Sequence, residues 1–195
     1  MEYARLLTEV REHVTTLFQT NDNKVLLYHN LAHTLEVGKR SNEIGQYYSL
    51  SAGQFFILTT AALFHDVGYL FTRPIHHEEE GMRRMTEYLV EKDVPGRVVL
   101  QIAQAILATK RSVEPLTMID KIICDADTYH FGTSDFKRTD ALVKRELELQ
   151  TDSTFPNWAQ RSIVMLKKHT YYTAYCQARL NNGKEENIAW LTSLL

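Results

Sequence analysis

Two short polar stretches carry the residue types in this chain that are best suited to chemistry. The first reads Tyr28-His29-Asn30-Leu31-Ala32-His33, and the second is the adjacent pair His65-Asp66. Two histidines four residues apart share one face of a helix, if the segment is helical, and can then point into a single cleft. The pair adds a neutral nitrogen and a charged oxygen, a mixture that suits a borderline divalent metal ion. The working hypothesis is a metal-dependent hydrolase.

The pattern of apolar residues predicts helices that would position these stretches. Apolar residues at steps of three and four predict a helix over residues 3–18, and a second helix is expected over residues 31–48. An almost wholly apolar run predicts a third helix over residues 55–67. The third is apolar on all sides, so we expect it at the centre of the fold, with His65 and Asp66 at its end. Gly68 follows, and its freedom at positive φ suits a helix terminus. Ser51 and Gln54 have the spacing of a capping box for this helix.

The rest of the chain is also helical in pattern. Further helices are expected from residues 76, 95 and 115, over residues 135–149 and 155–180, and after Asn182-Gly183. Loops are expected at residues 21–23, 71–75 and 150–154. The sequence has no convincing pair of alternating strands. The prediction is an all-α fold, a compact helical bundle that forms one domain over residues 1–195.

Composition limits the classes of partner. The 195 residues include 22 Lys and Arg against 24 Asp and Glu, with no long basic run, so we expect no nucleic-acid polymer as partner. Cys124 and Cys176 form no C-x-x-C pattern and are interpreted as reduced interior residues. No segment has the roughly 20 apolar residues of a membrane span, so no membrane partner is expected. The N-terminus from Met1 has no leader pattern, and a cytoplasmic location is the expectation.

Four of the polar residues resemble a known signature. His33, the pair His65-Asp66 and Asp127 resemble the H…HD…D pattern of the HD-domain superfamily of metal-dependent phosphohydrolases, over residues 28–132. The resemblance implies that these four residues coordinate one divalent metal ion at the centre of a helical bundle. Manganese, iron, nickel, cobalt, zinc and magnesium all suit such ligands. Helices over residues 155–195 would then pack on this core.

The first stretch also resembles a narrower family. Its spelling is similar to the Y-H-N-x-x-H motif of cyclic-nucleotide phosphodiesterases, which implies that His29 is the general acid that protonates the leaving oxygen. The chain departs from that family at Tyr69, where the phosphodiesterases have a second histidine. The glutamine region of their nucleotide pocket is not identifiable either. A cyclic nucleotide is therefore not implied as the substrate.

The segment that begins at His77 decides between one and two metal ions. His77 and Gly81 resemble the H-x-x-x-G segment of dinuclear HD hydrolases, in which the histidine binds a second metal ion. Those proteins supply another histidine one helix later, where residues 105–110 of this chain have none. We therefore predict one metal ion, with His77 and Lys110 facing the substrate phosphate, over a second metal site at His77.

The predicted function is hydrolysis of a phosphoester by metal-activated water, with a nucleotide or another small phosphorylated metabolite as substrate. Two alternatives stay open. One is a non-catalytic HD module that binds a nucleotide, and the other is a di-iron HD oxygenase, which the missing histidine disfavours.

Other polar residues near the motifs receive simpler interpretations. His76 is expected to be the exposed neighbour of His77, and Glu78, Glu79 and Glu80 a solvated first turn. Asp125 either orients a ligand histidine or faces water. His130 follows Asp127 closely enough to line the cleft.

Overall fold

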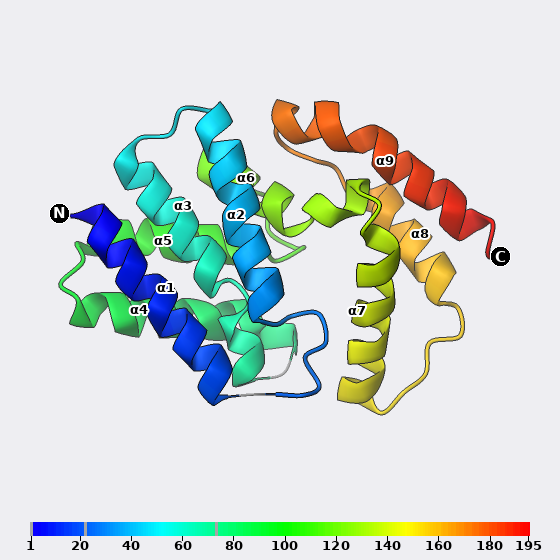
Figure 1. Ribbon diagram of the computed structural model, residues 1–195, viewed down its shortest axis with the longest axis horizontal. Helices are drawn as coiled ribbons and strands as arrows, with labels where there is room; N and C mark the ends of the chain where they lie inside the picture. Colours follow the sequence, from blue (N-terminus) through cyan, green and yellow to red (C-terminus); the bar gives the residue numbers. More distant parts are fainter. Residues whose placement is uncertain (1, 22, 73) are drawn as a thin grey trace. The chain divides into compact units, whose positions relative to one another are not determined.

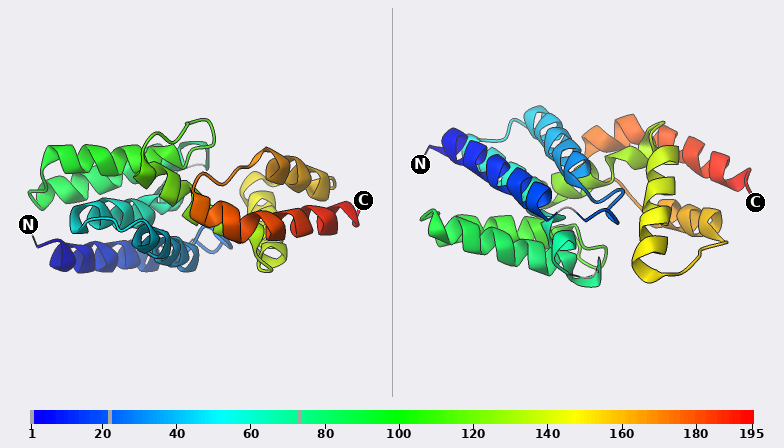
Figure 2. Two further views of the ribbon diagram at one scale, coloured as in Figure 1. Left: turned by 90° about the horizontal axis from the view of Figure 1, so that it is seen from above. Right: turned by 60° about the horizontal axis from the view of Figure 1, so that its bottom comes forward.

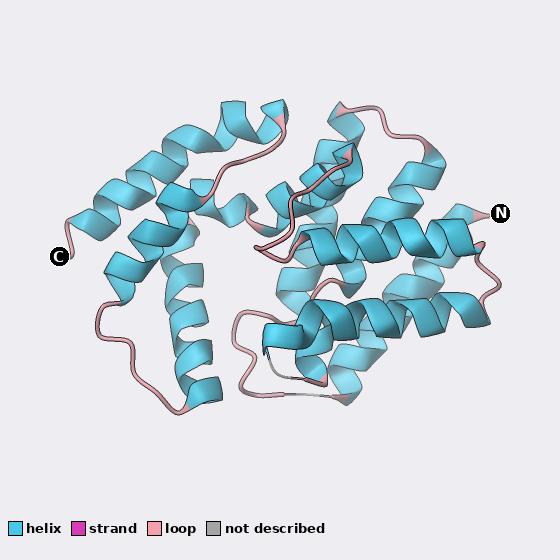
Figure 3. Cartoon of the chain, turned by 180° about the vertical axis from the view of Figure 1, so that it is seen from behind, coloured by secondary structure: helices cyan, strands magenta, loops and turns pink. Residues whose placement is uncertain are grey.

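The fold is entirely helical, as predicted. The computed structural model describes residues 2–21, 23–72 and 74–195. Helices take up 74% of the chain. The described residues form nine α-helices and three short 3-10 helices, and none of them lies in a strand (Figure 3). The all-α prediction is confirmed.

The chain divides into two compact units, and each is described by itself. The first contains the described residues up to Asn23 together with His29–Asp127, and the second contains Lys24–Tyr28 and Thr128–Leu195. The prediction of one HD-type domain over residues 1–195 stays a prediction.

The first unit is built around a buried helix. Its elements are α1 (Tyr3–Thr20), α2 (Leu31–Tyr47), α3 (Ala52–Phe64), η1 (Val67–Leu70), η2 (Pro74–His76), α4 (His77–Glu91), α5 (Gly96–Ala108) and α6 (Met118–Asp127). Every residue of α3 from Phe56 to Phe64 is buried. Helix α3 contacts α1, α2, α5 and α6, and Figure 2 shows it between α1 and the pair α4 and α5. The prediction of a central apolar helix is confirmed.

Side-chain caps set the starts of two helices next to the polar stretches. The Ser51 side chain accepts a hydrogen bond from the backbone N–H of Gln54, and the Gln54 side chain accepts one from the backbone N–H of Ser51. This is the predicted capping box. Asn30 caps α2 by accepting from the backbone N–H groups of Ala32 and His33. His29 therefore precedes the helix that carries His33.

Glycines allow the end of α3 to lie directly against α4. A Cβ atom added at Gly68 would overlap the carbonyl oxygen of His77, and one at Gly81 would lie 2.6 Å from the carbonyl oxygen of Phe64. Gly68 has no positive φ, so the interpretation based on its backbone freedom was wrong. The position needs a glycine because a neighbouring backbone occupies the space of a side chain.

The second unit corrects the predicted helices at the C-terminus. It contains η3 (Tyr129–Gly132), α7 (Phe136–Thr151), α8 (Trp158–Lys168) and α9 (Ala174–Thr192), shown in Figure 1. The helix predicted over residues 155–180 is instead two helices separated by residues 169–173. Tyr171 in this break is fully buried, and its hydroxyl group donates to the carbonyl oxygen of Thr128. Thr173 then caps α9 by accepting from the backbone N–H of Cys176.

The predicted helix end at Asn182-Gly183 is also wrong, because α9 continues to Thr192. Gly183 lies within that helix, where a Cβ atom would overlap the carbonyl oxygen of Gly132. The glycine thus permits a close contact between α9 and η3 instead of ending a helix.

Smaller differences concern the ends of elements. Helix α3 ends at Phe64 instead of residue 67, and α6 begins at Met118, three residues after Pro115. The breaks predicted at 21–23 and 71–75 include Asp22 and Arg73, which lie outside the described residues. Among the described helices, none combines the length and apolar character needed to cross a membrane.

Candidate metal centre

Three helices of the first unit bring the four predicted metal ligands together. His33 lies in the first turn of α2, His65 and Asp66 directly follow α3, and Asp127 is the last residue of α6. Helix α2 contacts both α3 and α6. The buried end of α3 thus delivers its two polar residues to the point where the other two helices meet.

The ligand atoms of these residues form a closed ring of short distances. His33 Nε2 lies 3.1 Å from Asp127 Oδ1 and 3.3 Å from Asp66 Oδ2. His65 Nε2 lies 3.2 Å from the same Asp66 oxygen and 3.6 Å from the same Asp127 oxygen. His33, His65 and Asp127 each offer an atom within 4.8 Å of the others, and Asp66 joins the group through its contacts with both histidines.

These distances fit a single divalent ion. Ligands at about 2.1 Å from a metal are about 3.0 Å apart at right angles and about 3.4 Å apart in a tetrahedron. Two of the buried atoms, His65 Nε2 and Asp66 Oδ2, lie 3.2 Å apart, but neither forms a hydrogen bond of good geometry among the described residues. A buried polar atom without a hydrogen bond is costly unless another partner compensates. A metal ion is such a partner.

Burial is uneven around the ring of ligand atoms. The side chains of His33, His65 and Asp66 are 8%, 1% and 4% exposed, whereas that of Asp127 is 27% exposed. Three of the four candidate ligands are therefore enclosed by protein, and Asp127 is the most exposed of the four.

A backbone carbonyl group fixes the orientation of His65. Its Nδ1 lies 2.8 Å from the carbonyl oxygen of Ala62. A carbonyl oxygen only accepts, so Nδ1 carries the proton and donates it. The lone pair of the neutral ring is then on Nε2, the atom that faces Asp66 and Asp127. This is the tautomer that a metal-binding histidine needs at that atom.

The four groups shift each other's pKa values in opposite directions. Burial by itself lowers the pKa of His33 and His65, but the carboxylates of Asp66 and Asp127 outweigh it, and both histidine pKa values are raised. Burial by itself raises the pKa of Asp66 and Asp127, but the two histidines outweigh it, and both carboxyl pKa values are lowered. Without a metal ion, the charge of the carboxylates is thus balanced by protons on the histidines.

Two further histidines stand beside this ring of atoms. His77, the first residue of α4, has its Nε2 atom 3.6 Å from Asp66 Oδ1, the oxygen that does not face His33 and His65. Its Nδ1 lies 2.5 Å from the carbonyl oxygen of Pro74, which orients the ring as Ala62 orients His65. The ring of His29 lies 6.0 Å from that of His33, with the two ring planes inclined by 85°.

Comparison with known protein families agrees with this arrangement. The family model of the HD domain matches residues 30–132, which is just over half of the chain. The chain belongs to the HD-domain family. No curated protein and no solved structure matches it. The match confirms the resemblance to the HD-domain superfamily. HD domains are generally metal-dependent hydrolases that bind divalent ions. The narrower phosphodiesterase-like spelling stays a prediction.

Lys110 is not one of the four residues of the HD-domain signature. Its ammonium group, just beyond the end of α5, forms an ion pair with Glu79 of α4. Both side chains are partly exposed, so solvent screens this pair and it contributes little to stability. The predicted contact of Lys110 with a substrate phosphate stays a prediction. It requires Lys110 to leave Glu79 and to pair with the phosphate instead.

The other polar residues near the motifs differ in burial. His76 is exposed, as expected. Glu78 is only 7% exposed, so its assignment to a solvated turn was wrong. Its Oε2 atom lies 3.3 Å from Nδ1 of His77. Asp125 is fully buried, which excludes the alternative that it faces water. In the second unit, His130 contacts the hydroxyl group of Tyr28 at 3.1 Å.

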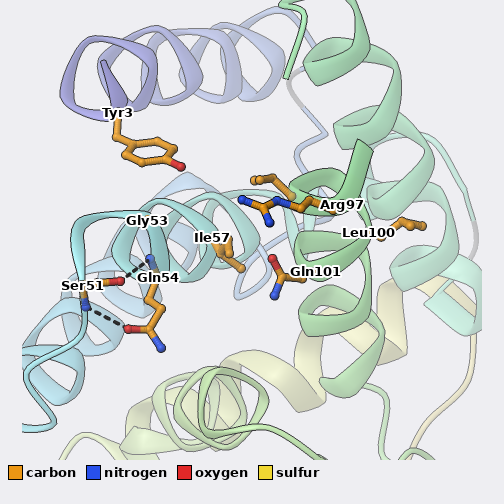
Figure 4. A pocket seen from close by; sticks show the side chains of 9 residues that line it. Tyr3, Ser51, Gly53, Gln54, Ile57, Arg97, Leu100 and Gln101 are labelled. Carbon is orange, nitrogen blue, oxygen red and sulfur yellow. Dashed lines mark hydrogen bonds between the residues drawn. The ribbon is translucent and has the colours of Figure 1, made fainter. Parts of the chain in front are cut away.

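A separate hollow in the first unit lies at the other end of α3. It has a volume of about 550 Å³ and is lined by Tyr3, Ser51, Gly53, Gln54, Ile57, Arg97, Val98, Leu100 and Gln101 (Figure 4). Ser51 and Gln54 are already bonded to each other in the capping box. The lining includes no histidine or carboxylate, so this hollow supplies none of the metal-binding chemistry.

The raised histidine pKa values predict that metal binding displaces protons. His33 and His65 hold protons above the usual pH range of a histidine, and both must lose them to coordinate a metal. We expect metal affinity to rise with pH by about tenfold per pH unit for each proton displaced, and to level off above the raised pKa values. Calorimetric titration of the metal-free protein with Zn²⁺ in two buffers of different protonation enthalpy measures the proton number.

The exposed His76 supplies the control for this titration. His76→Ala leaves the buried ring of ligand atoms intact and should release the same number of protons. Binding without proton release near pH 6 would contradict the assignment of His33 and His65 as ligands.

Proposed function

We propose that this protein is a metal-dependent phosphohydrolase that acts on a phosphoester of a nucleotide or another small phosphorylated metabolite. The observation that carries the proposal is the ring of four ligand atoms at 3.1–3.6 Å from His33, His65, Asp66 and Asp127. Two nitrogens and two oxygens at these distances would hold one divalent ion, and this ligand set is one that suits hydrolytic chemistry on a phosphoryl group.

A divalent ion held by these four residues would lower the pKa of water toward neutral pH and would offset negative charge on the phosphoryl group. The protein's own residues do the remaining work. Asp66 presents one oxygen to His33 and His65 and the other to His77, so a single carboxylate sets the relative position of three imidazoles. The partly exposed side of the group, at Asp127, is where a substrate would enter.

Departure of the leaving group requires a proton donor, and the chain offers His29 and His77. Both imidazoles lie beside the four candidate ligand atoms. A histidine within hydrogen-bonding reach of the leaving oxygen is a suitable general acid near neutral pH. We assign the donor role to His29, in line with the phosphodiesterase-like motif. His77, oriented by the Pro74 carbonyl group, would hold a phosphate oxygen, with Lys110 contributing positive charge after it leaves Glu79.

A screen of metals and substrates tests the proposed activity. Purified protein loaded with Mn²⁺, Mg²⁺, Ni²⁺ or Co²⁺ is assayed against nucleoside monophosphates, triphosphates and cyclic phosphates. We expect turnover of at least one class, and its loss after removal of the metal by a chelator. Inactivity with all substrates alongside tight nucleotide binding would instead indicate a non-catalytic module. Two irons per chain, found by metal analysis, would indicate the oxygenase.

The loss of kcat on substitution of the proposed donor, His29, should depend on the leaving group of the substrate. For an alkyl phosphoester, His29→Asn should lower kcat by about 10²–10⁴-fold, because the poorly leaving alkoxide needs a proton. For a p-nitrophenyl ester the loss should be much smaller, because that leaving group departs without one. Measurement of kcat for the two esters at equal metal content separates proton donation from metal binding.

The same pair of esters distinguishes the two candidate donors. His77→Asn should lower kcat for both esters by similar factors if His77 only holds the phosphate. The exposed neighbour gives a matched control, and His76→Asn should change neither value. A leaving-group effect at residue 77 and none at residue 29 would reverse the assignment.

A further inference from the structure

Tyr69 lies between His29, the candidate general acid, and His77, the candidate phosphate-binding residue. Its ring is stacked on that of His29, with centroids 4.2 Å apart and planes inclined by 17°. It is also stacked on the ring of His77, with centroids 4.0 Å apart and planes inclined by 26°. Two imidazoles cannot both lie about 4 Å above one face of a phenol ring without overlapping. They therefore occupy opposite faces of Tyr69.

The backbone around Tyr69 is tied to the candidate ligands. The Tyr69 N–H donates to the carbonyl oxygen of Asp66 at 3.1 Å, and η1 therefore begins directly from a proposed metal ligand. The adjacent Gly68 lies against the backbone of His77 so closely that no side chain fits between them. The phenol ring is thus held in place from the same short segment that supplies Asp66.

The histidines themselves come from segments with little regular structure to fix them. His29 precedes the cap residue of α2, and His77 is the first residue of α4, so neither ring is held within the interior of a helix. Packing on its faces restrains a ring at such a position, and for His77 this packing adds to the hydrogen bond between Nδ1 and the Pro74 carbonyl oxygen. Tyr69 is the side chain that packs on both.

We propose that Tyr69 is a positioning residue that holds His29 and His77 on the two faces of its ring, each in one orientation toward the candidate metal centre. This inference rests on the proposed function for its effect on catalysis. Because the phenol ring separates the imidazoles, the two cannot exchange places at one substrate oxygen. Tyr69 therefore also keeps the role of proton donor distinct from that of phosphate binding.

Three substitutions test the stacking. Tyr69→Phe keeps an aromatic ring, whereas Tyr69→Leu removes it. Phe71→Leu removes a nearby ring that packs on Arg84 instead of on a histidine, with the guanidinium carbon 3.5 Å from the centroid. The metal-loaded proteins are compared by steady-state kinetics and by NMR relaxation of the Cε1–Hε1 groups of His29 and His77. Metal content and melting temperature are measured for each variant.

We expect Tyr69→Leu to lower kcat by about 10- to 100-fold with KM changed less than threefold, because a small misplacement of a reacting group has effects of this size. Both histidine rings should lose order in this variant. Tyr69→Phe and Phe71→Leu should keep the order of both rings and kcat within threefold of the original protein. Tyr69→Met, which is flexible and has no ring, replaces the leucine variant if that one fails to fold.

The relaxation measurement separates this inference from the proposed function. If the original protein hydrolyses no phosphoester but its histidines lose order in Tyr69→Leu, the proposed function fails and the positioning role stands. If the histidines remain ordered in Tyr69→Leu, the positioning role is overturned whatever the activity. Loss of order in Tyr69→Phe equal to that in Tyr69→Leu would also overturn it, because the hydroxyl group would then be responsible.

Discussion

Asp66→Ala is expected to abolish metal binding and, with it, hydrolysis. Asp66 is 4% exposed at its side chain and lies 3.3 Å or less from Nε2 of both His33 and His65. Its removal leaves three ligands and separates His77 from the group. Loss of even an outer partner of a metal ligand typically costs 10- to 100-fold in affinity, so loss of a ligand should cost at least about 100-fold. The expected fall in kcat is about 10³-fold or more.

Metal analysis after gel filtration and phosphoester turnover measure the two effects. Asp135→Ala is the matched control, because Asp135 is an aspartate in an exposed ion pair with Arg138 in the second unit. It should retain both metal and activity. Full metal content together with full activity in Asp66→Ala would refute the proposed metal centre. Full metal content with no activity would assign Asp66 to catalysis instead of to metal binding.

The central helix and the signature residues could be predicted because their pattern is local. The run from Phe56 to Phe64 is apolar on every side, and burial is the direct consequence. The Ser51 and Gln54 cap is likewise a matter of spacing over three residues. The convergence of His33, His65 and Asp127 needs long-range contacts between α2, α3 and α6. The sequence predicted it only through resemblance to a family.

The errors lie where contacts between distant residues override a local pattern. Tyr171 fits a continuous helix by spacing, but burial of its ring and the bond of its hydroxyl group to Thr128 stabilise a break. Gly183 was interpreted as the end of a helix, although the space that it leaves is filled by Gly132 from η3. The stacking of Tyr69 on His29 joins segments far apart in the sequence, and its stacking on His77 depends on how η1 lies against α4. The departure from the phosphodiesterase motif at Tyr69 was the one signal that pointed to this residue.

Gly68→Ala is expected to be strongly destabilising and to damage the candidate metal centre. A methyl group at this position overlaps the carbonyl oxygen of His77, which is backbone and has no rotamer by which to move away. Relief of the overlap must move η1 away from the start of α4, and this separates Asp66 from His77. Insertion of an extra carbon into a packed site costs about 1–3 kcal/mol, and a clash with backbone belongs at the upper end. We expect a loss of about 3 kcal/mol in the free energy of unfolding, measured by urea denaturation of the metal-free protein.

Gly96→Ala is the matched control, because it is the same substitution at a glycine with different surroundings. Gly96 is the first residue of α5, and no atom lies within 4 Å of an added Cβ. Alanine is favoured over glycine in a helix by up to about 1 kcal/mol, so Gly96→Ala should leave stability unchanged or raise it slightly. Opposite signs for the two variants would show that contact with His77 decides the effect at Gly68. Equal and small effects would mean that α4 does not lie against η1 as described, and the placement of His77 beside Asp66 would be wrong with it.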